Sequence, residues 1–173
     1  MPGRKEEMEV RKHRDDLIGE NTKGDAGQLI LACLFFAVWI ADSFFLNRTT
    51  MLNSIVPLGI RLPIGIMLLL LSAYLARTGM AIVFGEKREK PSVIRKSVFG
   101  VVRHPIYLSE VLLYPGLLMM SLSLAATVIW LIGIAFLHYI SRYEEKVLLA
   151  HFGEEYRQYM AEVPMWMPRL RRK

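Results

Sequence analysis

Four long apolar runs, divided by polar and charged segments, set the pattern of this chain. They extend from about Gln28 to Leu46, from Ile60 to Val83, from Ile106 to Met120 and from Leu124 to Ile140. Long apolar runs separated by dense charge are typical of membrane-spanning helices and their loops rather than of a soluble domain. The last two runs are short, yet helices of about 23–26 Å suffice for a tilted crossing or a locally thinned bilayer. We therefore predict an all-α integral membrane protein with about four transmembrane helices.

The polar segments divide the chain into three parts. Residues 1–27 form a charged N-terminal arm whose glycines disfavour a long helix, and which is too polar for a cleavable signal peptide. Residues 28–85 hold two scaffold helices. Residues 86–173 hold a basic loop, a helical hairpin and a short cytoplasmic helix, which we expect at 152–159 after a break at Gly153. The single cysteine, Cys33, excludes an intrachain disulfide.

The distribution of Lys and Arg predicts the orientation in the membrane. The arm carries six of them, residues 85–104 carry six, and the tail from Arg142 onward carries seven, whereas Arg48 and Arg61 lie towards the other side. The positive-inside rule then places both termini, the long loop and any site beside them in the cytoplasm of a multi-pass protein. Because this charge lies at span ends, facing anionic headgroups, the net charge of +6 indicates membrane lipids and not nucleic acid as the partner.

A candidate site follows from the antiparallel hairpin. Arg103-His104-Pro105 opens its first helix and Glu144-Glu145 lies near the end of its second, so both should lie on one face of the membrane. Pro105 suits a first helical turn, and the free N–H groups there, with donors from Arg103 and His104, favour an anion. The paired carboxylates would accept hydrogen bonds from an amine, a ribose hydroxyl or a cationic centre. These residues alone predict a membrane enzyme with a cytoplasmic cofactor site, and they leave the reaction open.

Other polar residues within the apolar runs carry weaker signals. Glu110, one turn into the third run, is equally compatible with function and with snorkelling to the surface. Asp42 and Arg61 lie towards the same side of the membrane, and we expect a structural pair. His138 is more readily explained by packing than by cofactor contact. The remaining histidines and acids lack the spacing of metal ligands, so no metal is expected.

Several motifs in series resemble a known family. They are Arg103-His104-Pro105-Ile106-Tyr107, Glu144-Glu145, Phe152-Gly153-Glu154-Glu155-Tyr156-Arg157-Gln158-Tyr159, Val163-Pro164 and Pro168. In this order and spacing, over roughly residues 90–168, they resemble the C-terminal signature of the isoprenylcysteine carboxyl methyltransferase family, much of which related phospholipid methyltransferases share.

The resemblance implies a membrane-embedded enzyme that uses S-adenosylmethionine to methylate an isoprenylcysteine-like carboxylate or another apolar, lipid-linked acceptor. It assigns cofactor contacts to the segment from Arg103 through His104 and Pro105 to Tyr107, and to the pair Glu144 and Glu145. Arg142 is implied to orient an acceptor carboxylate. Glu145, or His104, is the candidate base for an acceptor that needs deprotonation. The oligomeric state stays open.

Two other functions remain at this point. Sterol-type reductases that use NADPH resemble this region, including a segment like Arg103-His104-Pro105. The acidic pair followed by Phe152-Gly153-Glu154-Glu155-Tyr156 fits a methyltransferase better, and a nicotinamide phosphate would need more clustered arginines than Arg142 and Arg157. The other alternative is a non-catalytic membrane protein built on the same core.

Overall fold

The computed structural model describes residues 22–85 and 91–168, and these ranges contain helices and no strand. The helices are α2 (Thr22–Ile40), continued by a π-helical turn η1 (Ala41–Leu46), then η2 (Met51–Ser54), α3 (Leu58–Gly85), η3 (Ser97–Gly100), α4 (Pro105–Leu118), α5 (Leu124–Phe152) and α6 (Glu154–Glu162). Within these ranges the segments Gly24–Leu46, Leu58–Gly85 and Leu124–Phe152 are long and apolar enough to cross a membrane, and α4 is a shorter apolar helix. The prediction of an all-α integral membrane protein is confirmed.

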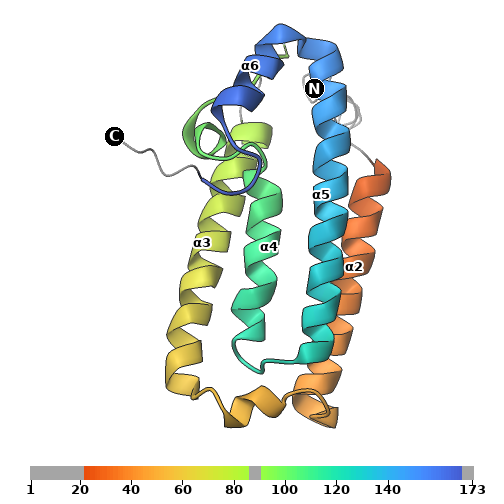
Figure 1. Cartoon of the computed structure of the whole chain (residues 1–173), viewed down its shortest axis with the longest axis vertical. Coiled ribbons are helices and arrows are strands. Elements are labelled where there is room, and N and C mark those ends of the chain that lie inside the picture. The colour runs from red at the N-terminus through yellow and green to blue at the C-terminus, as the bar shows by residue number, and fades with distance from the viewer. Residues whose placement is uncertain (1–21, 86–90, 169–173) are drawn as a thin grey trace, which may run out of the picture.

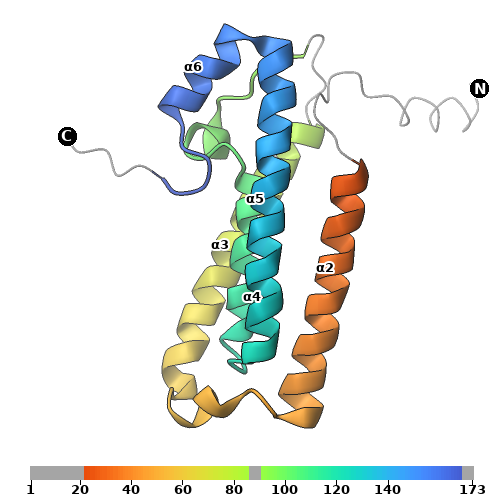
Figure 2. The same ribbon diagram turned by 45° about the vertical axis from the view of Figure 1, so that its right-hand side comes forward.

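The helices lie side by side in the order α3, α4, α5, α2 (Figures 1 and 2). The hairpin of α4 and α5 therefore occupies the middle, and the two preceding helices flank it. One end of the bundle carries the link from α2 to α3 and the turn between α4 and α5. At the other end, α6 folds back from α5 over the start of α4. Sequence-distant parts of the last third of the chain meet there.

Small residues hold α3 close against α4. A Cβ atom on Gly65 would lie 2.9 Å from the carbonyl oxygen of Gly116, and one on Gly79 would lie 2.8 Å from Ile106 Cγ1. Between these points Ser72 Oγ donates a hydrogen bond of 2.7 Å to the carbonyl of Ser109. Such close backbone approach is how helices associate where lipid removes the hydrophobic driving force. This packing fixes the position of α4 along the bundle axis relative to α3, and with it the position of the residues at its start.

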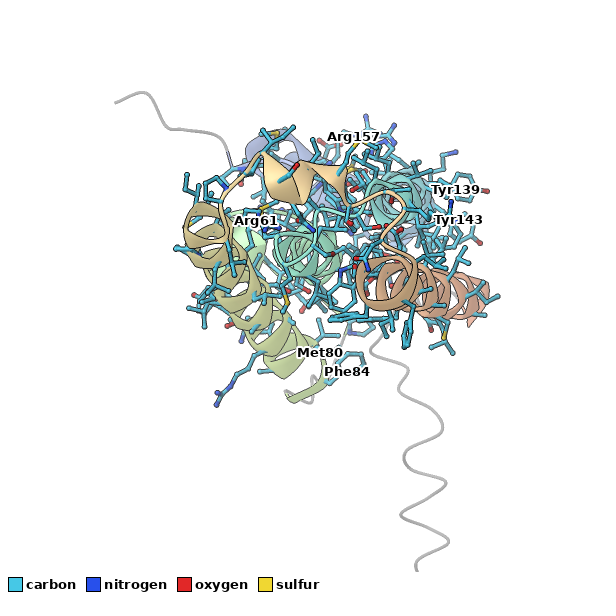
Figure 3. The ribbon with its side chains drawn as sticks, turned by 90° about the horizontal axis from the view of Figure 1, so that it is seen from below. Arg61, Met80, Phe84, Tyr139, Tyr143 and Arg157 are labelled. Atoms are coloured by element: carbon cyan, nitrogen blue, oxygen red, sulfur yellow. The ribbon has the colours of Figure 1, made fainter. Side chains whose placement is uncertain are left out.

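Buried charges at the far end have partners of their own. Asp42 accepts hydrogen bonds from the hydroxyl groups of Thr49 and Ser123 and from two backbone N–H groups just after η1. Arg61 donates to the Asn53 side chain and to the carbonyls that follow α4, at 3.3 and 3.5 Å, and it points in among the helices (Figure 3). The expected Asp42–Arg61 pair is wrong, because hydroxyl and backbone N–H groups surround Asp42, whereas the Asn53 amide and backbone carbonyls accept from Arg61.

Two helices extend by more than one turn beyond the apolar runs that predicted them. The first begins at Thr22, inside the predicted arm, of which residues 1–21 lie outside the described residues. There Gly27 permits close approach, since a Cβ atom on it would lie 2.2 Å from Phe136 Cζ on α5. The fourth run continues as helix past Ile140 to Phe152, so both glutamates of the acidic pair are helical. The predicted break is confirmed, because Gly153 has φ +55° and separates α5 from α6.

Candidate functional site

The start of α4 and the last turns of α5 bring five predicted site residues together. Arg103 Nε donates to Glu145 Oε1 at 2.7 Å, and His104 Nε2 lies 3.3 Å from the same oxygen. The Tyr107 hydroxyl donates to Glu144 Oε1, and His104 Nδ1 lies 3.7 Å from Glu144 Oε2. The basic and acidic walls that the hairpin predicts are therefore in direct contact.

The local geometry at the start of α4 directs the His104 and Tyr107 side chains towards α5. Pro105 occupies the first turn, where its missing N–H costs nothing. His104 precedes it at the N-cap and Tyr107 follows three residues on, so both lie on one helix face. Their rings stack with centroids 5.7 Å apart and planes 11° from parallel. The stacked imidazole presents one nitrogen to each glutamate of α5.

The chain after α6 returns to the start of α4 and closes the cluster. Arg103 donates through its guanidinium to the carbonyls of Met160, at 3.0 Å, and of Val163. Its backbone N–H bonds the carbonyl of Pro164 at 2.9 Å, and that of His104 bonds Met165 at 3.3 Å. The donors of Arg103 that the sequence assigned to an anion are thus directed to Glu145 and to protein carbonyls. In this arrangement Arg103 holds Glu145 and the tail in place.

Helix α6 and the segment before α4 brace each other over this cluster. Tyr156 and Tyr159 are buried, and burial raises the pKa of both hydroxyls. The Tyr159 hydroxyl donates to the carbonyl of Phe99 at 2.7 Å. Arg95 lies 5.6 Å from the centre of the Tyr159 ring and 3.5 Å from the Glu162 carboxylate. Helix α6 therefore covers the polar cluster that α4 and α5 form, and its two buried tyrosines hold it there.

Three polar atoms near the cluster in sequence are buried without a hydrogen-bond partner among the described residues. They are Glu145 Oε2, Ser141 Oγ and Trp166 Nε1. Glu145 is only 2% exposed, and Ser141 lies one turn before it on the same helix. Leaving such groups unpaired costs about 1–3 kcal/mol each, so native proteins seldom do so without a reason. Sequence reasoning missed Ser141, although its spacing from Glu145 points to it.

Arg142 lies at the edge of this cluster. Its guanidinium is 3.6 Å from Glu145 Oε2, and 57% of its side chain is exposed. His138, one turn earlier on α5, is exposed as well. Tyr139 and Tyr143 project from the outer side of the same helix (Figure 3). The second half of α5 thus presents Glu145 inwards and a mixed polar and aromatic face outwards.

Comparison with known families decides the class of this protein. A family model described as phospholipid methyltransferase matches residues 56–155, which contain α3, α4, α5 and the five clustered residues. The chain belongs to the phospholipid methyltransferase family. It is therefore an integral membrane methyltransferase that acts on lipid-type substrates, and the resemblance read from the motifs is confirmed. The family match begins well before residue 90, so α3 belongs to the family's shared region. Comparisons with curated proteins and with solved structures give no match.

Proposed function

We propose that this protein transfers a methyl group from S-adenosylmethionine to an isoprenylcysteine-like carboxylate or another lipid-borne acceptor. Family membership supports the reaction, since phospholipid methyltransferases generally use this cofactor. The observation that carries the site is the Glu145 carboxylate, which is buried, has one oxygen held by Arg103 and His104, and has a second oxygen without a hydrogen-bond partner among the described residues. Such an oxygen is an acceptor prepared for a ligand's amine or hydroxyl.

The donor and acceptor set fits the cofactor. S-adenosylmethionine combines an ammonium group, ribose hydroxyls and a sulfonium centre, all of which suit carboxylate neighbours. Glu145 Oε2 and the Glu144 carboxylate would accept from its donors, and Trp166 Nε1 would donate to its acceptors. Pro105 completes the cofactor-binding segment by starting α4 where it does. When bound, the cofactor supplies an electrophilic methyl group.

The residues of this chain then act mainly by positioning. Arg103 fixes Glu145, and Tyr107 fixes Glu144, so neither carboxylate needs to reorganise when a ligand binds. Arg142, exposed at the rim, would orient an acceptor carboxylate, which needs no general base at neutral pH. For an amine or phenol acceptor, His104 or Glu145 would take the proton.

The same proposal assigns a role to each of the three larger segments of the chain. Residues 86–173 would form the methyltransferase core, residues 28–85 its scaffold, and residues 1–27 a charged arm. The basic segments support an orientation with both termini and the site facing the cytoplasm, where S-adenosylmethionine is made. The acceptor would come from the membrane.

The test is calorimetric titration of the protein in phosphatidylcholine nanodiscs with S-adenosylhomocysteine, and with NADPH in parallel. We expect the first ligand to bind and the second not to. Glu145→Gln replaces the carboxylate by a neutral amide, Trp166→Phe removes the indole N–H, and each should weaken binding by about tenfold or more. Glu154→Gln is the matched control, because this glutamate is exposed and pairs only with Arg157 in the next turn of α6 among the described contacts.

Thermal unfolding of each variant separates lost binding from lost folding. Binding of NADPH alone would make the protein a reductase. S-adenosylhomocysteine affinity that is unchanged in folded Glu145→Gln and Trp166→Phe would remove the site assignment. Transfer of a labelled methyl group to lipids with carboxylate or amine heads then identifies the acceptor.

A further inference from the structure

The outer side of α5 carries aromatic and basic side chains near the end of its apolar part. The residues are His138, Tyr139, Arg142, Tyr143 and Lys146, and all five are exposed. At 3.6 residues per turn they lie within about 140° of the helix surface, so they form one strip, which we call the outer basic face. Tyr139 and Tyr143, 69% and 47% exposed, project away from the bundle (Figure 3). Because the described helices leave this face uncovered, its neighbours in a membrane are lipids.

The outer basic face lies at the depth of the lipid head groups. The apolar run of α5 ends at Ile140. The strip begins at His138, in the last apolar turn, and ends at Lys146, about 12 Å further along the helix axis. Tyrosines gather at this depth because their rings are apolar and their hydroxyls are polar, and Arg and Lys side chains there reach the phosphates.

The two cations of this face lie one turn apart and lack a close carboxylate partner. Among the described contacts Lys146 has no ion pair, and Arg142 reaches Glu145 Oε2 only at 3.6 Å, with 57% of its side chain exposed. The face itself contains no acidic residue, because Glu144 and Glu145 are directed to α4. Guanidinium, ammonium and phenol donors together suit a phosphate. Since phosphatidylcholine balances its phosphate with its own ammonium, the better partner is an anionic phospholipid.

Arg142 connects the outer basic face with the candidate site. Its guanidinium stands beside the Glu145 oxygen that has no hydrogen-bond partner among the described residues. A cation at this distance competes with the donor groups of any ligand for the same oxygen. A phosphate on the lipid side of Arg142 draws the guanidinium outwards and so weakens this competition. The guanidinium has five N–H donors, so donors remain for an acceptor on its inner side.

We propose that the outer basic face binds one anionic phospholipid, and that this lipid raises the affinity of the site for its cofactor by drawing Arg142 away from Glu145. The lipid is neither the cofactor nor the acceptor, and only its effect on cofactor affinity rests on the proposed function. Arg142 and Lys146 bind the phosphate, the hydroxyls of Tyr139 and Tyr143 add hydrogen bonds, and the acyl chains lie along the apolar part of α5.

The first experiment measures lipid binding by native mass spectrometry of the full chain, with phosphatidylglycerol and phosphatidylcholine as probes. We expect one molecule of phosphatidylglycerol to bind with an affinity about tenfold above that of phosphatidylcholine. Lys146→Gln should weaken this binding about fivefold, and Arg142→Gln/Lys146→Gln about 25-fold. Arg77→Gln is the matched control, because Arg77 on α3 is also exposed beside an exposed tyrosine, Tyr74, but has no second cation one turn away.

Equal affinity for the two lipids would overturn the lipid site. So would a loss in Lys146→Gln no larger than that in Arg77→Gln, because binding would then follow the overall charge of the protein and not this face.

The second experiment titrates S-adenosylhomocysteine into nanodiscs of phosphatidylcholine alone and of an equal mixture with phosphatidylglycerol. This ligand has no net charge, so the anionic surface does not by itself concentrate it. We expect an affinity about fivefold higher in the mixture, and Lys146→Gln should lose this increase while keeping the affinity measured in phosphatidylcholine. The same affinity in both membranes, or an increase that persists in folded Lys146→Gln, would overturn the proposed coupling. Binding of S-adenosylhomocysteine in neither membrane would refute the proposed function, whereas a single phosphatidylglycerol lost in Lys146→Gln would still support the lipid site.

Discussion

The guanidinium of Arg103 supports both the acidic pair and the returning tail, so its removal should be among the costliest single changes in this protein. Only 8% of its side chain is exposed. Its Nε bonds Glu145 at 2.7 Å, and its other donors reach the carbonyls of Met160 and Val163. In Arg103→Ala, Glu145 would keep its buried charge and lose its strongest partner, and the tail would lose its side-chain attachment to α4 while keeping the two backbone hydrogen bonds at Arg103 and His104.

The magnitude follows from these contacts. Breaking a buried ion pair by deleting one partner costs about 3–5 kcal/mol, and each of the two carbonyl bonds adds about 1 kcal/mol. Against this, His104 at 3.3 Å and Arg142 at 3.6 Å remain beside the stranded Glu145 carboxylate. We therefore expect a loss of about 3–4 kcal/mol in the free energy of unfolding. Arg103→Lys keeps the charge without the planar fork and should cost about half as much.

The assay is equilibrium unfolding in mixed micelles of a mild and a denaturing detergent. Arg95→Ala is the control, because Arg95 also ties the loop to α6 but is 34% exposed at its side chain, and should cost about 1 kcal/mol or less. Combining Arg103→Ala with Glu145→Gln should cost less than the sum of the two single changes. Costs no larger for Arg103→Ala than for Arg95→Ala, or strict additivity in the double variant, would refute the reasoning.

The same assay checks three further expectations. Asp42→Ala leaves several buried donors unpaired and should cost about 2–3 kcal/mol, and a loss near zero would contradict the assigned hydrogen bonds. Gly65→Ala pushes a methyl group to 2.9 Å from the α4 backbone and should cost about 1–3 kcal/mol, whereas Gly59→Ala, which meets nothing, should be neutral or slightly stabilising. Because burial raises the pKa of Tyr156 and Tyr159 above 10.0, only the unfolded chain loses these protons as the pH rises past about 10. Stability should then fall by about 1.4 kcal/mol per pH unit for each tyrosine, and Tyr156→Phe/Tyr159→Phe is the matching control, in which the slope against pH should be smaller by that amount.

The apolar runs predict the bundle well because the bilayer leaves helices as one of its few solutions for the backbone. They fail where helix is stabilised by protein contacts instead of lipid. The part of α5 beyond Ile140 is too polar to read as a span, yet Leu148 and Leu149 pack against α6 and keep it helical. At the other end, Gly27 looks like a helix breaker in the sequence, while in the structure it is the point where α2 meets Phe136.

The candidate site, like the fold, could be predicted only in part from the sequence. A hairpin with a motif at each end must bring Arg103-His104 near Glu144-Glu145, and the structure places them in contact. What no spacing predicts is the third participant, the chain after α6. The Val163 carbonyl there accepts from Arg103, as does that of Met160 in the last turn of α6, and the Trp166 Nε1–H has no hydrogen-bond partner among the described residues. These contacts depend on how a tail folds back, which local sequence does not encode.

A reaction between a water-soluble cofactor and a lipid requires one place that both can reach, and on the proposed function the start of α4 provides it. The Tyr107 hydroxyl donates a hydrogen bond to Glu144 beneath α6. Glu110 follows one turn later on α4 and lines a cleft among the membrane-spanning helices. On the proposed function, a helix of 14 residues holds the site residues of its first turn near the depth of the lipid head groups. A longer α4 would carry its first turn, and the proposed cofactor-binding residues with it, away from the depth of the lipid head groups.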